Sequence, residues 1–246
     1  MPYRAIIAAM LAFACVFACA GCSPVSKAEF ESDVAQVDAK SAEQSVPKSY
    51  TIKRVDGKAK WKRTPQMDID NAQWLDAGGI AAHAQLCYDD EALYVHMWAE
   101  ESDVLATYRK SDPVPDTYQD SCLEFFLAPV EGDERYVNFE FNANAAVRTE
   151  IGAERTERVA LVPSGDTYSA KAKTTDEGWD LKFKLPYSFL RTLYPDFEAQ
   201  SGVQMHGNFY KCGDNTAQKH YLTWSRVGSD TPDFHRPDSF GDLVFE

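Results

Sequence analysis

Two carboxylates and an aromatic ring come close together in the segment VPDTYQDSCLEFFLAP. Asp120 and Glu124 are four residues apart, so a β-strand would place them on the same face, with Tyr118 just before the strand. A tyrosine ring can cover the apolar C–H face of a sugar while carboxylates accept hydrogen bonds from paired hydroxyl groups. The segment is compatible with a sugar site, and equally with a strand face that is merely solvated.

The segment YVNFEFNAN has one apolar and one hydrogen-bonding strand face. The second face carries an aromatic ring, two amides and a carboxylate: Tyr136, Asn138, Glu140 and Asn142. Exposed strand faces more often carry Lys, Thr and Glu, so this combination favours a polar ligand. The same alternation in GNFYKCGD adds Tyr210 as a candidate.

An aromatic and two basic residues lie between prolines in the segment TPDFHRPDSFGDLVFE. Because Pro232 and Pro237 restrict the loop, Phe234 can be held ready as a platform for a ligand, with His235 and Arg236 at its edge. The alternative is a closing loop in which Phe234 is buried and Arg236 pairs with a nearby aspartate.

Strand patterns separated by turn signals dominate residues 49–246. In GWDLKFKLP, apolar residues alternate strictly with polar ones from Trp179 to Leu185. One short helix is expected in YSFLRTLYPDF, beginning after Pro186 and stopped by Pro195. Many short strands with one helix predict an all-β domain, an antiparallel β-sandwich.

The first 48 residues have the pattern of an exported bacterial lipoprotein. A basic Arg4 precedes a short apolar run that ends in CAGC. We therefore expect a signal peptide over 1–21, a lipid anchor to a membrane at Cys22 and a flexible tether over 22–48. The expected location is the bacterial cell envelope, with secretion after simple cleavage as the alternative. The net charge of −13 argues against nucleic acid as a partner.

The cysteines and aspartates of the domain leave several possibilities open. Cys122 and Cys212 could form a disulfide in an oxidising compartment, or stay as buried free thiols like Cys87. The aspartates of MDID and SDPVPD could hold calcium or simply face water. The five histidines show no close zinc spacing.

Seven segments, taken in order, resemble the family 9 carbohydrate-binding modules and, more narrowly, family 9-like proteins exported as bacterial lipoproteins. The segments are YDDEALYVHMWAE, YQDSCLEFFLAP, YVNFEFNAN, WDLKFKLPYSFL, GNFYKCGD, HYLTWSRV and PDFHRPDSFGDLVF. The resemblance implies a β-sandwich related to DOMON domains. It also implies non-catalytic binding of a plant-type polysaccharide or oligosaccharide in carbohydrate catabolism, structural calcium nearby, and a glycoside hydrolase as partner.

In the family, two aromatic rings clasp the end of a sugar chain with help from polar side chains. By position, the resemblance assigns these rings to Phe234 and Tyr118, the strand carboxylate to Glu124 and a polar contact to Lys211. The family rings are typically tryptophans, and a sugar-contacting arginine of the family aligns with Glu140. The resemblance therefore implies sugar binding without indicating which sugar.

Two other functions remain compatible with the sequence. A glycoside hydrolase would use two carboxylates among Asp120, Glu124 and Glu140. A haem-binding DOMON-type domain would use an axial histidine or methionine from the His-Met pair at 96–97 or the Met-His pair at 205–206.

Overall fold

The computed structural model describes residues 47–162 and 164–246. The expected signal peptide, the anchor residue Cys22 and nearly all of the expected tether lie outside the described residues. Within the described part of the chain, no helix is both long enough and apolar enough to cross a membrane.

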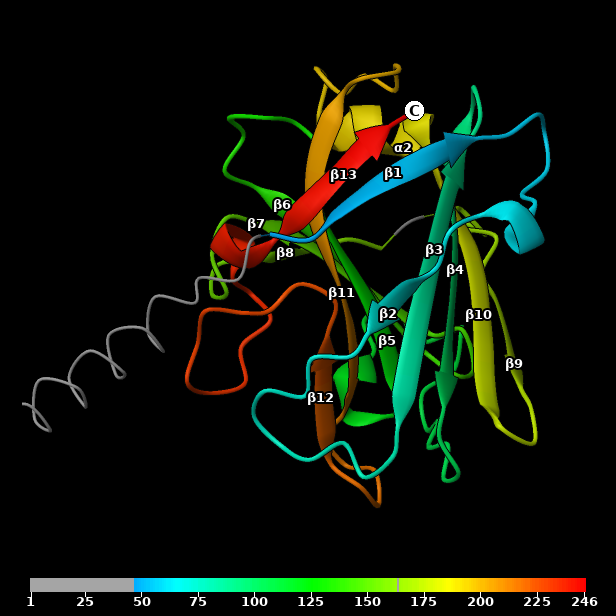
Figure 1. Cartoon of the computed structure of the whole chain (residues 1–246), viewed down its shortest axis with the longest axis vertical. Coiled ribbons are helices and arrows are strands. Elements are labelled where there is room, and N and C mark those ends of the chain that lie inside the picture. Colours follow the sequence, from blue (N-terminus) through cyan, green and yellow to red (C-terminus); the bar gives the residue numbers. More distant parts are fainter. Residues whose placement is uncertain (1–46, 163) are drawn as a thin grey trace, which may run out of the picture. The chain divides into compact units, whose positions relative to one another are not determined.

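The described residues form two β-sheets that share strand β1 (Figure 1). The first sheet has the order β8-β7-β6-β5-β11-β13-β1, with β12 paired to β11, and the second has the order β1-β3-β4-β10-β9, with β2 paired to β3. The strands are β1 (Ser49–Arg54), β2 (Met67–Ile69), β3 (Ala81–Tyr88), β4 (Ala92–Glu100), β5 (Cys122–Ala128), β6 (Tyr136–Asn142), β7 (Val147–Gly152), β8 (Val159–Ala160), β9 (Lys171–Thr174), β10 (Gly178–Pro186), β11 (Gln204–Gly213), β12 (His220–Thr223) and β13 (Gly241–Phe245). This arrangement confirms the predicted all-β sandwich.

Strand β1 departs from the antiparallel pattern. It pairs in parallel with both β13 and β3, whereas the other strand pairs are antiparallel. Its register with β13 runs from Ser49 opposite Asp242 to Ile52 opposite Phe245. The two ends of the domain therefore lie side by side, which closes the first sheet onto the second.

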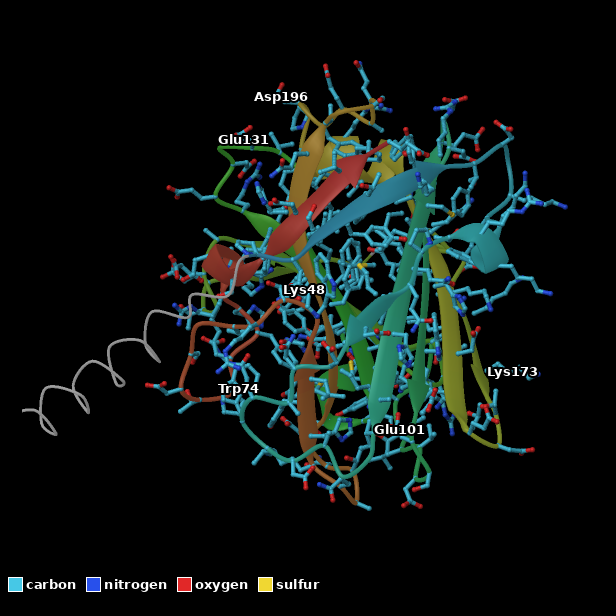
Figure 2. All side chains as sticks on the ribbon, in the orientation of Figure 1. Lys48, Trp74, Glu101, Glu131, Lys173 and Asp196 are labelled. Atoms are coloured by element: carbon cyan, nitrogen blue, oxygen red, sulfur yellow. The ribbon has the colours of Figure 1, made fainter. Side chains whose placement is uncertain are left out.

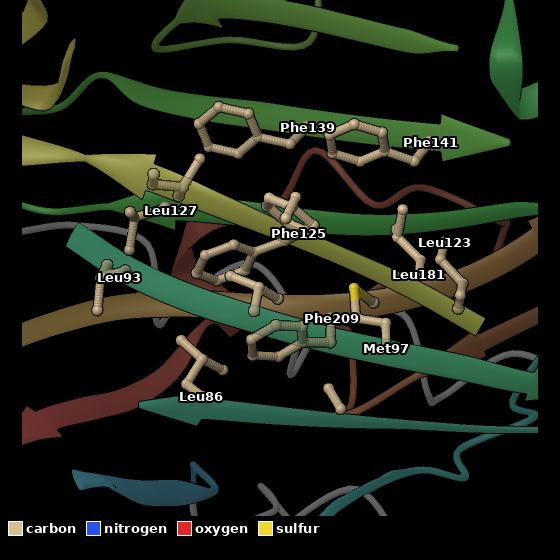
Figure 3. Packing of buried hydrophobic residues seen from close by; sticks show 14 of the residues in the cluster. Leu86, Leu93, Met97, Leu123, Phe125, Leu127, Phe139, Phe141, Leu181 and Phe209 are labelled. Carbon is tan, nitrogen blue, oxygen red and sulfur yellow. The ribbon is translucent and has the colours of Figure 1, made fainter. Parts of the chain in front are cut away.

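The hydrophobic core takes side chains from both sheets (Figure 3). Leu86, Met97 and Leu181 come from the second sheet, and Phe125 and Phe209 come from the first. The rings of Phe125 and Phe209 stack with centroids 4.4 Å apart. The predicted alternation along β10 is confirmed, because Trp179, Leu181, Phe183 and Leu185 are all buried.

The helix α2 (Tyr187–Leu193) begins directly after Pro186, as predicted. Short 3-10 turns are η2 (Trp61–Arg63), η3 (Thr117–Gln119) and η4 (Pro237–Ser239). The turn η3 matters for the site because it sets Tyr118 immediately before β5.

Candidate functional site

A pocket of about 330 Å³ lies on the face of the first sheet that points away from the core. Its floor comes from β5, β6, β7 and β11, and its walls come from η3, β12 and the loop before η4. The lining residues are Tyr118, Glu124, Glu140, Arg148, Glu150, Arg155, Cys212, Asp214, Tyr221, Pro232, Asp233, Phe234 and His235.

Strand register explains how the floor is built. Glu124 on β5 lies opposite Tyr210 on β11 and opposite Glu140 on β6, and Glu140 in turn lies opposite Arg148 on β7. One row across four strands therefore supplies an aromatic ring, two carboxylates and a guanidinium to the same face.

The two floor carboxylates are almost fully buried, with 2% of Glu124 and 5% of Glu140 exposed. Burial, followed by the neighbouring Cys212 and Glu140, raises the pKa of Glu124 well above its usual value. Burial also raises the pKa of Glu140 to about 7, although Arg148 opposes this increase. The raised pKa favours the protonated form of Glu124, which can donate as well as accept hydrogen bonds.

The guanidinium groups at the pocket are held by carboxylates. Arg148 donates hydrogen bonds of 2.7 Å to Asp116 and of 2.7 Å to Glu150. Arg155 donates a hydrogen bond of 2.6 Å to Asp233. This bond ties the loop between β7 and β8 to the loop from Pro232 to Pro237, called the proline loop below. The pocket thus has five carboxyl groups against two guanidinium groups in its lining.

Phe234 forms part of the wall and also packs into the protein. Its ring stacks on Tyr210 with centroids 4.1 Å apart and planes 10° apart, and the Tyr210 hydroxyl donates a 3.0 Å hydrogen bond to the Phe234 carbonyl. Trp74, labelled in Figure 2, contacts the same ring at a centroid distance of 5.9 Å. Only 8% of Phe234 is exposed. The proline loop is therefore fixed in place, with a small part of the ring facing the pocket.

The other aromatic groups of the wall are more accessible. Tyr118 and Tyr221 are partly exposed, and the Tyr221 hydroxyl donates a hydrogen bond to Asp214. His235 is hydrogen-bonded through Nδ1 to the Tyr136 hydroxyl at 2.8 Å. Burial, then Arg158 and Arg155, lowers the pKa of His235 to about 3, so the imidazole is neutral.

Five of the residues proposed from the sequence meet at this pocket: Tyr118, Glu124, Glu140, Phe234 and His235. The structure does not place the other three in its lining. Tyr210 is fully buried behind Phe234, and Arg236 pairs with Asp238 at 3.0 Å. Lys211 points to the opposite face because it follows Tyr210 on the same strand, and its Nζ lies 3.1 Å from Glu101 inside the protein.

The Asp120 side chain is buried and holds neighbouring backbone in place. Its carboxylate accepts hydrogen bonds of 2.8 Å from the backbone N–H of Thr107, 3.2 Å from that of Tyr108 and 2.8 Å from the Asn142 amide. Of the two alternatives for this segment, the merely solvated strand face is wrong, because the side chains of Asp120 and Glu124 are both buried.

The two cysteines that could have formed a disulfide are free thiols in the structure. Cys122 and Cys212 are directly opposite each other on β5 and β11, and the Cys212 thiol donates a 2.9 Å hydrogen bond to Glu124 Oε1. Cys87 is also free and buried.

In each of the two pairs considered for haem, at 96–97 and 205–206, the methionine and the histidine point to opposite faces of their strand. Met97 and Met205 are buried in the core. His96 is hydrogen-bonded to Asp180, and His206 lies 3.2 Å from Asp242 near the surface.

The aspartates considered for calcium are engaged in other contacts. Asp68 contacts His83 at 2.8 Å, and Asp70 contacts Lys48 at 2.9 Å. Asp112 accepts a hydrogen bond from the Arg109 backbone, and Asp116 pairs with Arg148.

Sequence reasoning did not single out eight of the thirteen residues that line the pocket. The residues it did not single out as candidates include four charged groups and one ring: Arg148, Glu150, Arg155, Asp233 and Tyr221. A signal was present for two of them, since Arg148 and Glu150 alternate along VRTEIG directly after the polar strand that holds Glu140. Arg155 and Asp233 come from irregular loops, where no periodicity points to a common face.

The burial of Glu140 predicts a pH-dependent stability. The unfolded chain releases this proton near the usual value of 4.5, whereas the folded protein keeps it up to about 7, so rising pH between these values favours unfolding. In Glu140→Gln this penalty is absent. The free energy of unfolding of the variant minus that of the original protein is expected to be about 3 kcal/mol larger at pH 8 than at pH 4, so the variant gains relative stability as pH rises. Urea unfolding at both pH values measures this difference, and an equal offset at both would contradict the raised pKa.

The chain is similar to known proteins over nearly all of its described residues. A model of carbohydrate-binding family 9 matches residues 54–245. A protein from Bacteroides uniformis, to which carbohydrate binding has been provisionally assigned, is 28% identical, with a TM-score of 0.69 over 82% of this chain and 100% of that one. No curated protein sequence matches the chain.

Two further structures share the fold. Both are of a family 9 carbohydrate-binding module from Caldicellulosiruptor kristjanssonii, one in complex with cellotriose and one with glucose. Their identities are 14% and 16%, their TM-scores are both 0.56, and they cover 81% of this chain and 94% and 96% of their own. Since the family model spans most of the sequence, this chain belongs to carbohydrate-binding family 9.

Proposed function

We propose that this protein binds a neutral sugar unit, at the end of or within a plant-type polysaccharide or oligosaccharide, in the pocket on the first sheet. The observation that carries the proposal is the pocket itself. It combines accessible rings from Tyr118 and Tyr221 with a row of hydrogen-bonding groups that includes Glu124 and Glu140. Family membership and the structures with cellotriose and glucose support the same function.

The charges of the pocket favour an uncharged ligand. Arg148 and Arg155 are already paired with carboxylates, so neither guanidinium is free to hold an acidic sugar. The neighbouring Asp214 and Glu150 would repel a uronic acid. Hydroxyl groups, in contrast, can donate hydrogen bonds to carboxylates and accept one from the protonated form of Glu124, which its raised pKa favours.

The expected affinity is modest. Rings that bury on the order of 100 Å² of sugar C–H surface contribute about 2.5 kcal/mol before the costs of association. Hydrogen bonds bring the dissociation constant into the range from about 1 mM to about 10 µM. A membrane anchor would compensate by raising the local concentration of binding sites.

We further propose that the protein works at the bacterial cell envelope, attached through a lipid on Cys22, and supplies a partner glycoside hydrolase with substrate during carbohydrate catabolism. The lipoprotein pattern of the N-terminal sequence supports this location. Mass spectrometry of the protein purified from its native membrane tests it, because an N-terminal peptide beginning at an acylated Cys22 is the expected result. An unmodified soluble form would contradict the anchor.

Calorimetry with xylan, cellulose and mannan oligosaccharides, with and without calcium, tests the binding proposal. Tyr118→Ala is expected to weaken binding about tenfold or more, because the ring supplies part of the contact with the sugar. Tyr94→Ala is the matched control, since Tyr94 is a similarly half-buried tyrosine on β4, outside the pocket. Equal affinities for the two variants would remove Tyr118 from the site, and no binding of any sugar by the folded protein would contradict the proposal.

A further inference from the structure

Three potential metal ligands converge at one end of the pocket floor. Cys122 and Glu124 are two residues apart on β5 and therefore share a face, and Cys212 on β11 lies directly opposite Cys122. One ligand atom from each of the three residues lies within 4.8 Å of the others. Among the described residues, this is the group of three or more His, Cys, Asp or Glu side chains that meets this condition.

We propose that Cys122, Glu124 and Cys212 form a binding site for a thiophilic divalent cation of the Zn²⁺ class, with a further coordination position open to the pocket. Two thiolates and one carboxylate are ligands that Zn²⁺ accepts in a tetrahedral arrangement. With zinc–sulfur bonds of 2.3 Å, neighbouring ligand atoms in a tetrahedron are about 3.8 Å apart. The ligand atoms of the three residues lie within 4.8 Å of one another, and Cys212 Sγ is 2.9 Å from Glu124 Oε1, so small shifts of the side chains suffice. Hard cations such as Ca²⁺ prefer oxygen ligands and do not fit this set.

The path to the site is open from the pocket. Glu124 and Cys212 are both in the pocket lining, whereas Cys122 lies beneath them and is fully buried. An incoming cation would therefore meet Glu124 and the Cys212 thiol first and would displace the hydrogen bond between them. The open position on the pocket side is where water or a sugar hydroxyl would complete the coordination shell.

Metal binding at these three side chains competes with protons. Zn²⁺ binds cysteine and glutamate in their deprotonated forms, so a bound dication would release protons from its ligands and its binding should weaken as pH falls. The carboxylates of Glu140 and Asp214 add negative potential at Glu124, whereas Lys211 adds positive charge near the two thiols.

This site shares Glu124 with the proposed sugar pocket, but it depends on the two thiols and not on the rings of the wall, so thiol variants test it separately from sugar binding. The same pair of opposed cysteines has one competing reaction, which is oxidation to a disulfide with loss of two protons and two electrons to an external disulfide oxidant. Oxidation would remove both sulfur ligands. The test must therefore begin with reduced protein.

The experiment is a titration of the reduced, purified protein with Cd²⁺, a spectroscopic probe for Zn²⁺ sites with thiolate ligands. We expect ultraviolet absorption from sulfur-to-cadmium charge transfer that saturates at one ion per chain and weakens at lower pH. Cys122→Ser and Cys212→Ser are expected to lower the affinity at least about 100-fold, and Glu124→Gln about tenfold. Cys87→Ser is the matched control, because Cys87 is another buried free thiol, on β3 of the second sheet, and should leave the titration unchanged.

A second measurement covers the case in which a serine variant fails to fold. In the unaltered reduced protein, Zn²⁺ is expected to protect Cys212 from alkylation, as measured by mass spectrometry of its peptide, while added chelator restores the reaction. Three results would overturn the proposal: no charge-transfer absorption in the folded reduced protein, an unchanged titration in folded Cys122→Ser and Cys212→Ser, or alkylation of Cys212 at the same rate with and without Zn²⁺.

Discussion

Replacing Lys211 with alanine is expected to lower the free energy of unfolding by about 3–5 kcal/mol. The Lys211 side chain is completely buried, and its ammonium group lies 3.1 Å from Glu101 and 2.7 Å from His220 Nε2. Burial, then Lys211 itself, lowers the pKa of His220 to about 4, so this imidazole is neutral and accepts the hydrogen bond from the ammonium group. Removing the lysine would leave the Glu101 carboxylate buried without its cation.

The neighbours of Glu101 explain why its carboxylate stays buried when the Lys211 cation is removed. Glu101 also accepts hydrogen bonds of 2.5 Å from Trp179 Nε1 and 3.0 Å from the Ser121 hydroxyl, which hold it inside the protein (Figure 2 labels its position). The double variant Lys211→Ala with Glu101→Gln should recover part of the stability, because the remaining amide is uncharged.

Urea unfolding measures these effects. The matched control is Lys219→Ala, which removes an exposed lysine that is 3.7 Å from Asp214 and should change stability by less than about 0.5 kcal/mol. A loss for Lys211→Ala as small as that for Lys219→Ala would show that the buried pair does not stabilise the fold as the structure indicates.

Replacing Phe234 with alanine is expected to abolish measurable sugar binding and to destabilise the loop before η4. The ring packs against Tyr210, Trp74 and Tyr221, so its loss leaves a cavity behind the pocket wall and costs about 3 kcal/mol. Because the expected affinity is already modest, a further tenfold loss would bring it to the limit of calorimetric detection.

Phe234→Leu separates the two roles of the ring. Leucine keeps most of the buried volume but offers no flat aromatic face, so this variant should lose less stability than Phe234→Ala while still binding sugar more weakly than the original protein. Calorimetry and urea unfolding on both variants give the comparison. Full affinity in Phe234→Leu would mean that the ring closes the loop without touching the sugar.

Period-two alternation predicted strands in both sheets. The apolar and polar faces of YVNFEFNAN are those of β6, which carries part of the site, and the faces of GWDLKFKLP are those of β10 in the second sheet. The short helix begins directly after Pro186, as predicted. Alternation reports only which residues share a face. It does not report that loops cover the polar face of β5 and β6. Because of this cover, Asp120 and Glu124 are buried.

Contacts between segments that are distant in the sequence account for the other features of the structure that the sequence did not predict. The parallel pairing of β1 with β13 joins residues at opposite ends of the domain, and no local pattern encodes it. Lys211 has the polar character expected of a surface or binding residue, and only the position of Glu101, directly after β4, explains its burial. Tyr221 lies in HYLTWSRV, one of the segments that carry the family resemblance, yet its place on the pocket wall depends on the pairing of β12 with β11.

A crystal structure of the protein with a bound oligosaccharide, chosen from the calorimetric screen, tests the central claim most directly. The account predicts a sugar ring in the pocket, in contact with Tyr118 or Tyr221 and hydrogen-bonded to Glu140. A sugar bound on another face of the domain, with the pocket between η3 and the proline loop left empty, would contradict it.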